Sequence, residues 1–203
     1  MAYDRLYMRS NCLPKSRLPS DRGVLDRPLL ALLCSRRCPG DLILKAYDAV
    51  QAVRNAGLPV IGGFHSPVEA DCLEILLRGT QPVVVCPARG IGRMRVKPAW
   101  KEPLAQGRLL LLSPFDDAQM RMTKELAEQR NRFVVDRAAA LLVVHANPGG
   151  QTEAAARRAL AQSKPVLTLP SPHNAHLVTH GAQPVPVPDL AAAVQATLKP
   201  MDP

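Results

Sequence analysis

Short apolar runs alternate with longer amphipathic segments along most of the chain. Six runs have the length and composition of buried strands: Pro28–Cys34, Leu58–Ile61, Gln81–Cys86, Arg108–Leu112, Ala139–His145 and Pro165–Leu169. Helical spacing of apolar positions marks the segments between them: Asp41–Ala56, Pro67–Arg78, Pro98–Gln106, Asp116–Arg137 and Gln151–Gln162. This alternation predicts an α/β fold with a doubly wound, mainly parallel sheet and helices on both of its faces.

The composition changes at both ends of the alternating region. Residues 1–27 are polar and interrupted by prolines, which predicts an extended or poorly ordered arm. Residues 28–170 form the predicted domain. Prolines become frequent in residues 171–203, where Asp189–Leu198 is the one segment with the pattern of a short helix.

Loops that follow parallel strands gather at the carboxyl edge of a sheet, where ligands bind near a reversal of strand order. Five loops meet this condition here: Ser35–Gly40, Gly62–Ser66, Pro87–Lys97, Ser113–Asp116 and Ala146–Gln151. We therefore expect the functional residues of this chain to lie in these loops.

Gly62 and Gly63 end the second predicted strand and lead into a helix. Ser66 suits the N-cap and Pro67 the first helical position. Glycines allow a ligand close to the backbone, and a helix start offers free N–H groups to a phosphate. His65 lies in the same turn and is the most suggestive histidine of the chain. The alternative is a turn that only packs the helix tightly against the sheet.

A second turn of the same kind follows the fifth predicted strand. Gly149 and Gly150 precede a helix that begins near Gln151 and Thr152, whose hydroxyl and backbone amides could hold an anion. Two glycine-rich helix starts in one small sheet indicate a phosphate or nucleotide-backbone site more specifically than one does. Packing turns remain the alternative.

Arginines supply a third feature, in Arg130-Asn131-Arg132. The guanidinium fork suits phosphate, because it can form two parallel hydrogen bonds. A spacing of two does not place both arginines on one helical face, so a shared groove requires a helix end or kink there. The alternative is a solvated face paired with Glu125 and Glu128.

The formal net charge of +9 favours a polyanionic partner. Part of this charge is concentrated in one loop that could track a nucleic-acid backbone, or could be an ordinary solvated surface: Arg89, Arg93, Arg95, Lys97 and Lys101. Aromatic residues make up only 3% of the chain, so few side chains are left for base stacking.

Evidence of catalysis is weak in the sequence. Glu69, Asp71 and Glu153 are the available carboxylates, but no Ser–His–Asp arrangement has the right context. We predict no catalytic residue and no cofactor. No metal site is predicted either, because no cysteine or carboxylate cluster accompanies the histidines of the tail. The five cysteines are expected to be reduced thiols. Without an apolar run long enough to span a membrane or a signal-peptide core, the chain is expected to be cytoplasmic.

Three features together resemble the Rossmann-like domain of the DprA (Smf) DNA-processing family. They are Gly62-Gly63 after a strand, Arg130-Asn131-Arg132 before an apolar segment, and Gly149-Gly150 with Thr152. The resemblance covers roughly residues 29–170. It implies binding of single-stranded DNA, in a family that protects incoming DNA during transformation and helps to load RecA. It also implies that exposed sheet edges could pair two copies in a homodimer. The chain has no room for the additional domains of longer members, so the expectation is a stand-alone domain.

The wider superfamily keeps a second function open, namely a pocket for a nucleotide or a nucleotide-derived ligand, in a sensor or an enzyme. Phosphoribohydrolases of this superfamily carry Pro-Gly-Gly, one residue, Gly-Thr, two residues and Glu. Here Pro148-Gly149-Gly150-Gln151 is followed directly by Thr152, and Ala156 stands where the glutamate should be. That difference argues against the hydrolase. We therefore predict a single-stranded DNA-binding module, with a nucleotide-binding protein as the alternative.

Overall fold

The computed structural model describes residues 21–92 and 94–198. Residues 1–20 of the predicted arm and the candidate residue Arg93 therefore lie outside the described residues. The described end of the arm contains a short helix, α2 (Asp21–Leu25), whose Val24 is buried against the domain.

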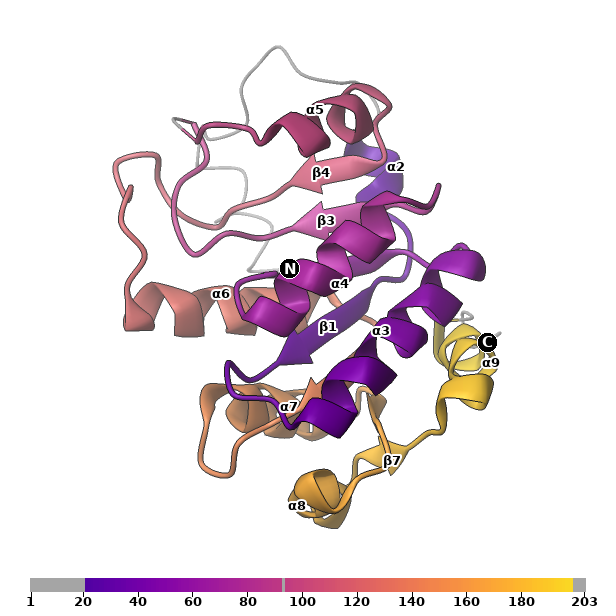
Figure 1. Cartoon of the computed structure of the whole chain (residues 1–203). Coiled ribbons are helices and arrows are strands. Elements are labelled where there is room, and N and C mark those ends of the chain that lie inside the picture. Colours follow the sequence, from indigo (N-terminus) through magenta and orange to yellow (C-terminus); the bar gives the residue numbers. More distant parts are fainter. Residues whose placement is uncertain (1–20, 93, 199–203) are drawn as a thin grey trace.

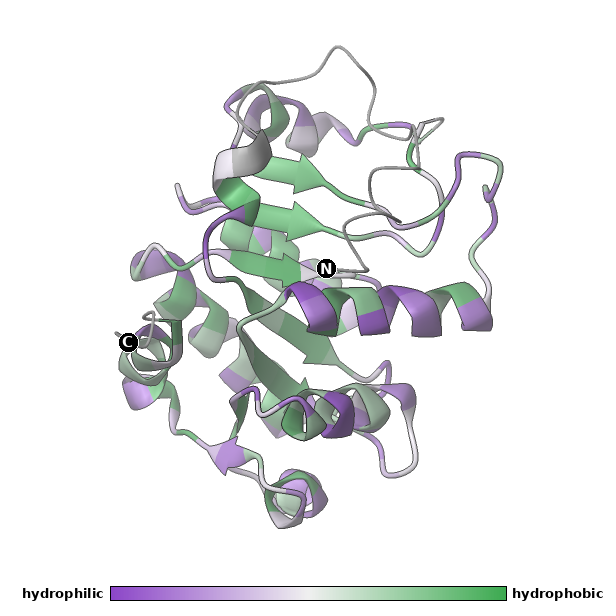
Figure 2. Ribbon diagram, turned by 180° about the vertical axis from the view of Figure 1, so that it is seen from behind, coloured by the Kyte–Doolittle hydropathy of each residue, from purple (hydrophilic) through white to green (hydrophobic). Residues whose placement is uncertain are grey.

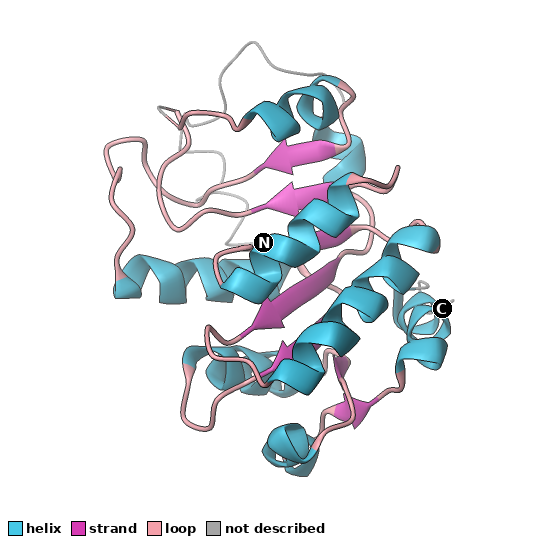
Figure 3. Cartoon of the chain, in the orientation of Figure 1, coloured by secondary structure: helices cyan, strands magenta, loops and turns pink. Residues whose placement is uncertain are grey.

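Seven parallel strands form one sheet, in the order β4-β3-β2-β1-β5-β6-β7 (Figures 1 and 3). Their bounds are β1 Leu30–Cys34, β2 Val60–Gly62, β3 Val83–Val85, β4 Leu109–Leu111, β5 Ala140–His145, β6 Val166–Thr168 and β7 Gln183–Pro184. All six predicted strands are present, and every pairing in the sheet is parallel. The predicted α/β, doubly wound fold is confirmed.

Helices cover both faces of the sheet (Figure 1). One face carries α3 (Gly40–Asn55), α4 (Pro67–Leu77), α5 (Pro98–Ala105) and α9 (Val187–Leu198). The other face carries α6 (Lys124–Arg137) and α7 (Gln151–Ala161), which lie in front of the apolar strands in Figure 2. Along β1, Leu30 and Leu32 pack into the first core, and Ala31 and Leu33 into the second. A continuous apolar strand therefore serves two cores at once.

The long helix expected over Asp116–Arg137 is wrong in its first third, because α6 begins only at Lys124. Thr123 caps that helix by accepting a hydrogen bond from the Leu126 amide. Further upstream, Asp116 accepts one from the Ala118 amide. Short polar side chains that bind nearby backbone in this way favour turns over helix.

The proline-rich segment after residue 170 contains more regular structure than expected. It forms η1 (Pro172–Asn174) and α8 (Ala175–Thr179), and β7 then pairs with β6 before α9. The predicted terminal helix is present and begins two residues earlier than expected. Within the part of the chain described, no helix is both long and apolar enough to cross a bilayer.

Candidate functional site

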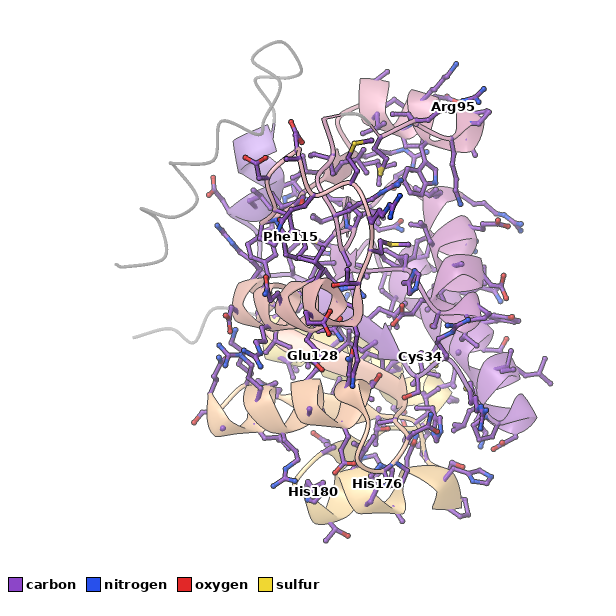
Figure 4. All side chains as sticks on the ribbon, turned by 90° about the vertical axis from the view of Figure 1, so that its left-hand side faces the viewer. Cys34, Arg95, Phe115, Glu128, His176 and His180 are labelled. Carbon is purple, nitrogen blue, oxygen red and sulfur yellow. The ribbon has the colours of Figure 1, made fainter. Side chains whose placement is uncertain are left out.

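The strand order reverses at β1, which has β2 on one side and β5 on the other. A cavity of about 510 Å³, here called the switch-point cavity, opens at the carboxyl ends of these three strands. Figure 4 looks onto this edge, with Cys34 near its centre and Glu128 of α6 beside it. The lining residues come from strand ends and helix starts far apart in sequence and include Ser35, His65, Glu69, Arg130, Asn147 and Thr152. This is the position where sheets of this kind bind ligands.

The structure brings half of the predicted site residues into this cavity: His65, Ser66, Arg130, Asn131, Gly150 and Thr152. Gly63 and Arg89 instead line a neighbouring cavity of about 670 Å³, which shares Arg130 with the first. Gly62 and Gly149 shape the two turns without lining any of these cavities. Arg132 is exposed on α6 and lines none of them.

The first glycine turn is closed by Glu69, which is only 6% exposed. One carboxylate oxygen accepts a hydrogen bond from the Cys34 amide at 2.8 Å, and the other accepts from the amides of His65 and Ser66 at 2.9 and 3.1 Å. Ser66 and Glu69 also form a capping box at the start of α4. The expectation of free amides at His65 and Ser66 is therefore wrong, because this carboxylate already occupies them.

Both glycines of this turn are explained by contacts within the protein. A Cβ atom on Gly62 would lie 3.1 Å from the Phe64 ring. Phe64 itself has a φ of 48°, an uncommon backbone conformation for an aromatic residue, and its ring is buried. A Cβ on Gly63 would overlap the guanidinium of Arg130 at 1.5 Å from Nη1. These contacts support the packing interpretation of the first turn.

Replacing Gly63 with alanine is expected to displace the Arg130 guanidinium. Because the Cβ would occupy the position of Nη1, we expect the free energy of unfolding to fall by about 1–3 kcal/mol, as for other overpacked sites. Urea unfolding measures this change. Gly40→Ala is the matched control, since nothing lies within 4 Å of its added Cβ. Equal unfolding midpoints for the two variants would contradict the observed packing.

Arg130 is the central cation of the site and is only 5% exposed. Its Nη1 donates to the Cys86 carbonyl at 3.1 Å, and its Nε donates to Asn131 Oδ1 at 2.9 Å. Nη2 has no hydrogen-bond partner among the described residues. Burial lowers the pKa of this guanidinium and nearby Glu69 opposes that effect, but arginine stays charged at neutral pH. Arg130 can therefore donate to a ligand from a fixed position.

The helix containing Arg130-Asn131-Arg132 runs without a break from Lys124 to Arg137. The kink or helix end that would bring both arginines into one groove is absent from α6. Arg130 consequently points inward and Arg132 is exposed.

The second glycine turn remains open at its helix start. Gly149 has a φ of 71°, which favours glycine, and Gly150 forms the N-cap of α7 without a side-chain cap. Glu153 holds the turn from behind: one oxygen accepts from the Gly149 amide at 2.5 Å and the other is 2.9 Å from His180 Nε2. Because Gln151 and Thr152 line the cavity, the uncapped start of α7 can present N–H groups to an anion.

Glu153 gives the second turn a defined dependence on pH. The hydrogen bond from Gly149, and then that from His180, lowers the pKa of Glu153 below its ordinary value of 4.5. Stability from the ionised carboxylate is present above this ordinary value and is lost as the pH falls through the lower folded value. Glu153→Gln should therefore be less stable than the wild type at about pH 7, and the gap should narrow at about pH 3. Urea midpoints at both pH values test this, and a constant gap would contradict it.

Sequence reasoning missed two basic residues of the switch-point cavity, Arg36 and Lys124. Arg36 directly follows β1, so its place after a strand could have identified it. Lys124 could not have been found, because it fell inside the helix predicted over Asp116–Arg137 and so did not stand out as a helix start. Among the described residues, no group of three His, Cys, Asp or Glu side chains could hold a metal ion.

Comparisons with known proteins agree with the fold. The family described as DNA recombination-mediator protein A matches residues 21–194. No curated protein sequence matched significantly. Similar solved structures include Helicobacter pylori DNA processing protein A, described for its single-stranded DNA binding mode, with a TM-score of 0.72, 18% identity, and coverage of 87% of this chain and 85% of that one.

Streptococcus pneumoniae DprA gives a TM-score of 0.69 with 18% identity over 83% of this chain, which spans only 62% of the pneumococcal chain. A molybdenum cofactor binding protein from Rippkaea orientalis gives 0.61 with 12% identity, covering 85% of this chain and 98% of that one. At these identities the structural likenesses show a shared fold.

Proposed function

The chain belongs to the DNA recombination-mediator protein A (DprA) family, and we propose that it binds single-stranded DNA in the switch-point cavity. One observation carries the proposal. The buried guanidinium of Arg130 and the uncapped start of α7 converge on a single cavity at the carboxyl edge of the sheet. Both groups are suited to a phosphate.

The lining suggests how a nucleotide would lie. A phosphate would accept hydrogen bonds from the amides at the start of α7 and from Arg130 Nη2, with Lys124 adding charge from the start of α6. The amide side chains of Asn131 and Asn147 line the same cavity and can bind base edges. Glu69 lies against the first glycine turn, where its charge disfavours a phosphate. The phosphate therefore belongs on the side of α7.

A single nucleotide or nucleotide-derived ligand is the second candidate. A volume of about 510 Å³ lies in the range of small-molecule pockets. The similarity to the molybdenum cofactor binding protein, which extends over nearly all of that chain, shows that this fold also occurs in a small-ligand protein.

A binding comparison separates the two candidates. Fluorescent single-stranded oligonucleotides, duplex DNA and nucleoside monophosphates would be titrated at about 50 mM and about 200 mM salt. We expect the single strand to bind, with an affinity that falls steeply with salt. Binding of mononucleotides with no binding of the oligonucleotide would favour the second candidate and overturn the first.

A further inference from the structure

A second cavity, of about 840 Å³, lies beside the first at the same edge, between β1, β5 and the start of α8. We call it the histidine-lined cavity. It shares Arg36 and Asn147 with the switch-point cavity, so the two adjoin. Its other polar lining residues are Arg37, Cys38, His145, His173 and His176. None of its lining residues is acidic, which makes it electrostatically suited to an anion.

His176 supplies the sharpest indication of a ligand. Its Nε2 is buried and has no hydrogen-bond partner among the described residues. Buried polar atoms are almost always paired, so this nitrogen, on a residue that lines the cavity, indicates a missing partner. The imidazole must turn toward the cavity to present the nitrogen to an anion. The imidazole packs edge to face with His180, with ring centroids 6.5 Å apart. His176 belongs to α8 and His180 follows its last residue, and both are labelled in Figure 4. The nearby carboxylate of Glu153 is bonded to His180.

His145 also lines the cavity, but unlike His176 its ring nitrogens contact side chains of the protein. Asn174 Nδ2 donates to the carbonyls of Val144 and Leu169 and to Thr168 Oγ1, which fixes Asn174 Oδ1 as an acceptor. His145 Nδ1 must then donate to that oxygen, at 3.0 Å. Its Nε2 lies 3.2 Å from the side-chain amide of Asn147. With the proton on Nδ1 this nitrogen is an acceptor, so the Asn147 amide must turn its Nδ2 toward the ring to engage it. An anion in this cavity is therefore left to the arginines and to the two other histidines, His173 and His176.

We propose that the histidine-lined cavity binds a phosphate group of the same strand, one that neighbours the nucleotide in the switch-point cavity, through Arg37 and His176. This rests on the proposed function. Arg36 lies between the two cavities and can contact either phosphate. The first turn of α3 lacks a side-chain cap, but Asp41 in that turn offsets its partial positive charge, so the arginines supply the positive charge of the site. Such a site would bind the internal phosphodiester or a terminal phosphate of the strand.

Arginine and histidine variants test the site. Arg37→Ala and His176→Ala should each weaken binding of an oligothymidylate about three- to tenfold at low salt, and Arg37→Ala should reduce the slope of log K against log salt by about 0.7. Arg54→Ala is the matched control, because it removes the same charge from the far end of α3. Affinities and slopes of Arg37→Ala and His176→Ala equal to those of Arg54→Ala would overturn the proposal.

Cys38 offers a readout that does not depend on affinity, because its half-buried thiol lines the cavity. In a Cys12→Ser background the remaining cysteines, Cys34, Cys72 and Cys86, are all buried. Saturating oligothymidylate should slow maleimide labelling of Cys38 several-fold, and Arg37→Ala should reduce this protection at equal saturation. An unchanged labelling rate in the presence of bound strand would overturn the proposal.

Two further comparisons identify the phosphate and separate the hypotheses. Equal affinity for 5′-phosphorylated and unphosphorylated oligothymidylate, with loss in Arg37→Ala, assigns the site to an internal phosphodiester. A preference for the phosphorylated strand that Arg37→Ala removes assigns it to a terminal phosphate. If the wild type binds no oligonucleotide, the proposed function itself fails. If Arg130→Ala loses binding while Arg37→Ala and His176→Ala do not, only the present inference fails.

Discussion

Arg130→Ala should reduce the affinity for single-stranded DNA by about 30-fold or more. That magnitude is typical when one partner of a buried, hydrogen-bonded charge contact is truncated. The guanidinium is held over Gly63 and bonded to the Cys86 carbonyl, so its position is fixed before a ligand arrives. Fluorescence anisotropy with a labelled oligonucleotide measures the loss. The variant should also be less stable by about 1–3 kcal/mol, because the Cys86 carbonyl loses its donor.

Arg132→Ala is the matched control for Arg130→Ala. It removes the same charge from the same helix two residues later, from an exposed position outside the cavities. We expect less than about a twofold change in affinity, as for a solvated charge on a surface. Urea unfolding of both variants shows that the assay contains folded protein. Equal losses in the two variants would mean that general charge, and not the switch-point cavity, drives binding.

Periodicity alone predicted the sheet, because continuous apolar runs separated by helical patterns fit few other folds. Loops after parallel strands necessarily meet at one edge, so the location of the site also followed from the sequence. Arg36 illustrates this, since it adjoins β1 and lies in both cavities. The strand β7 was not predictable in the same way. It has only two residues, and one of them is a proline that is tolerated because β7 lies at the edge of the sheet.

The roles of Gly62 and Gly63 could not be decided from the sequence. A glycine is equally necessary when a ligand or a side chain from elsewhere approaches the backbone. Here the approaching group is Arg130, which lies 67 positions away from Gly63 in sequence and meets it only because α6 packs across the end of β2. The open turn is the second one, where Gly150 leaves α7 uncapped. The two turns look alike in sequence, and packing makes them different.

Glu69→Ala should lower the free energy of unfolding by about 3 kcal/mol or more. The carboxylate accepts hydrogen bonds from three backbone amides, and each buried donor left without a partner costs about 1–3 kcal/mol. One of these amides belongs to Cys34 at the end of β1, so Glu69 also ties α4 to the neighbouring strand. Equilibrium urea unfolding, followed by circular dichroism, measures the change.

Glu74→Ala is the control for Glu69→Ala, because it removes an exposed carboxylate from the same helix and should change stability by less than about 0.5 kcal/mol. Glu69→Gln then separates structure from ligand contact. A glutamine presents one acceptor oxygen and one donor amide to three N–H groups, so it should recover only part of the stability. If Glu69 served mainly to contact a ligand, Glu69→Gln would bind more weakly at unchanged stability. That outcome would mean that the first glycine turn is part of the ligand site.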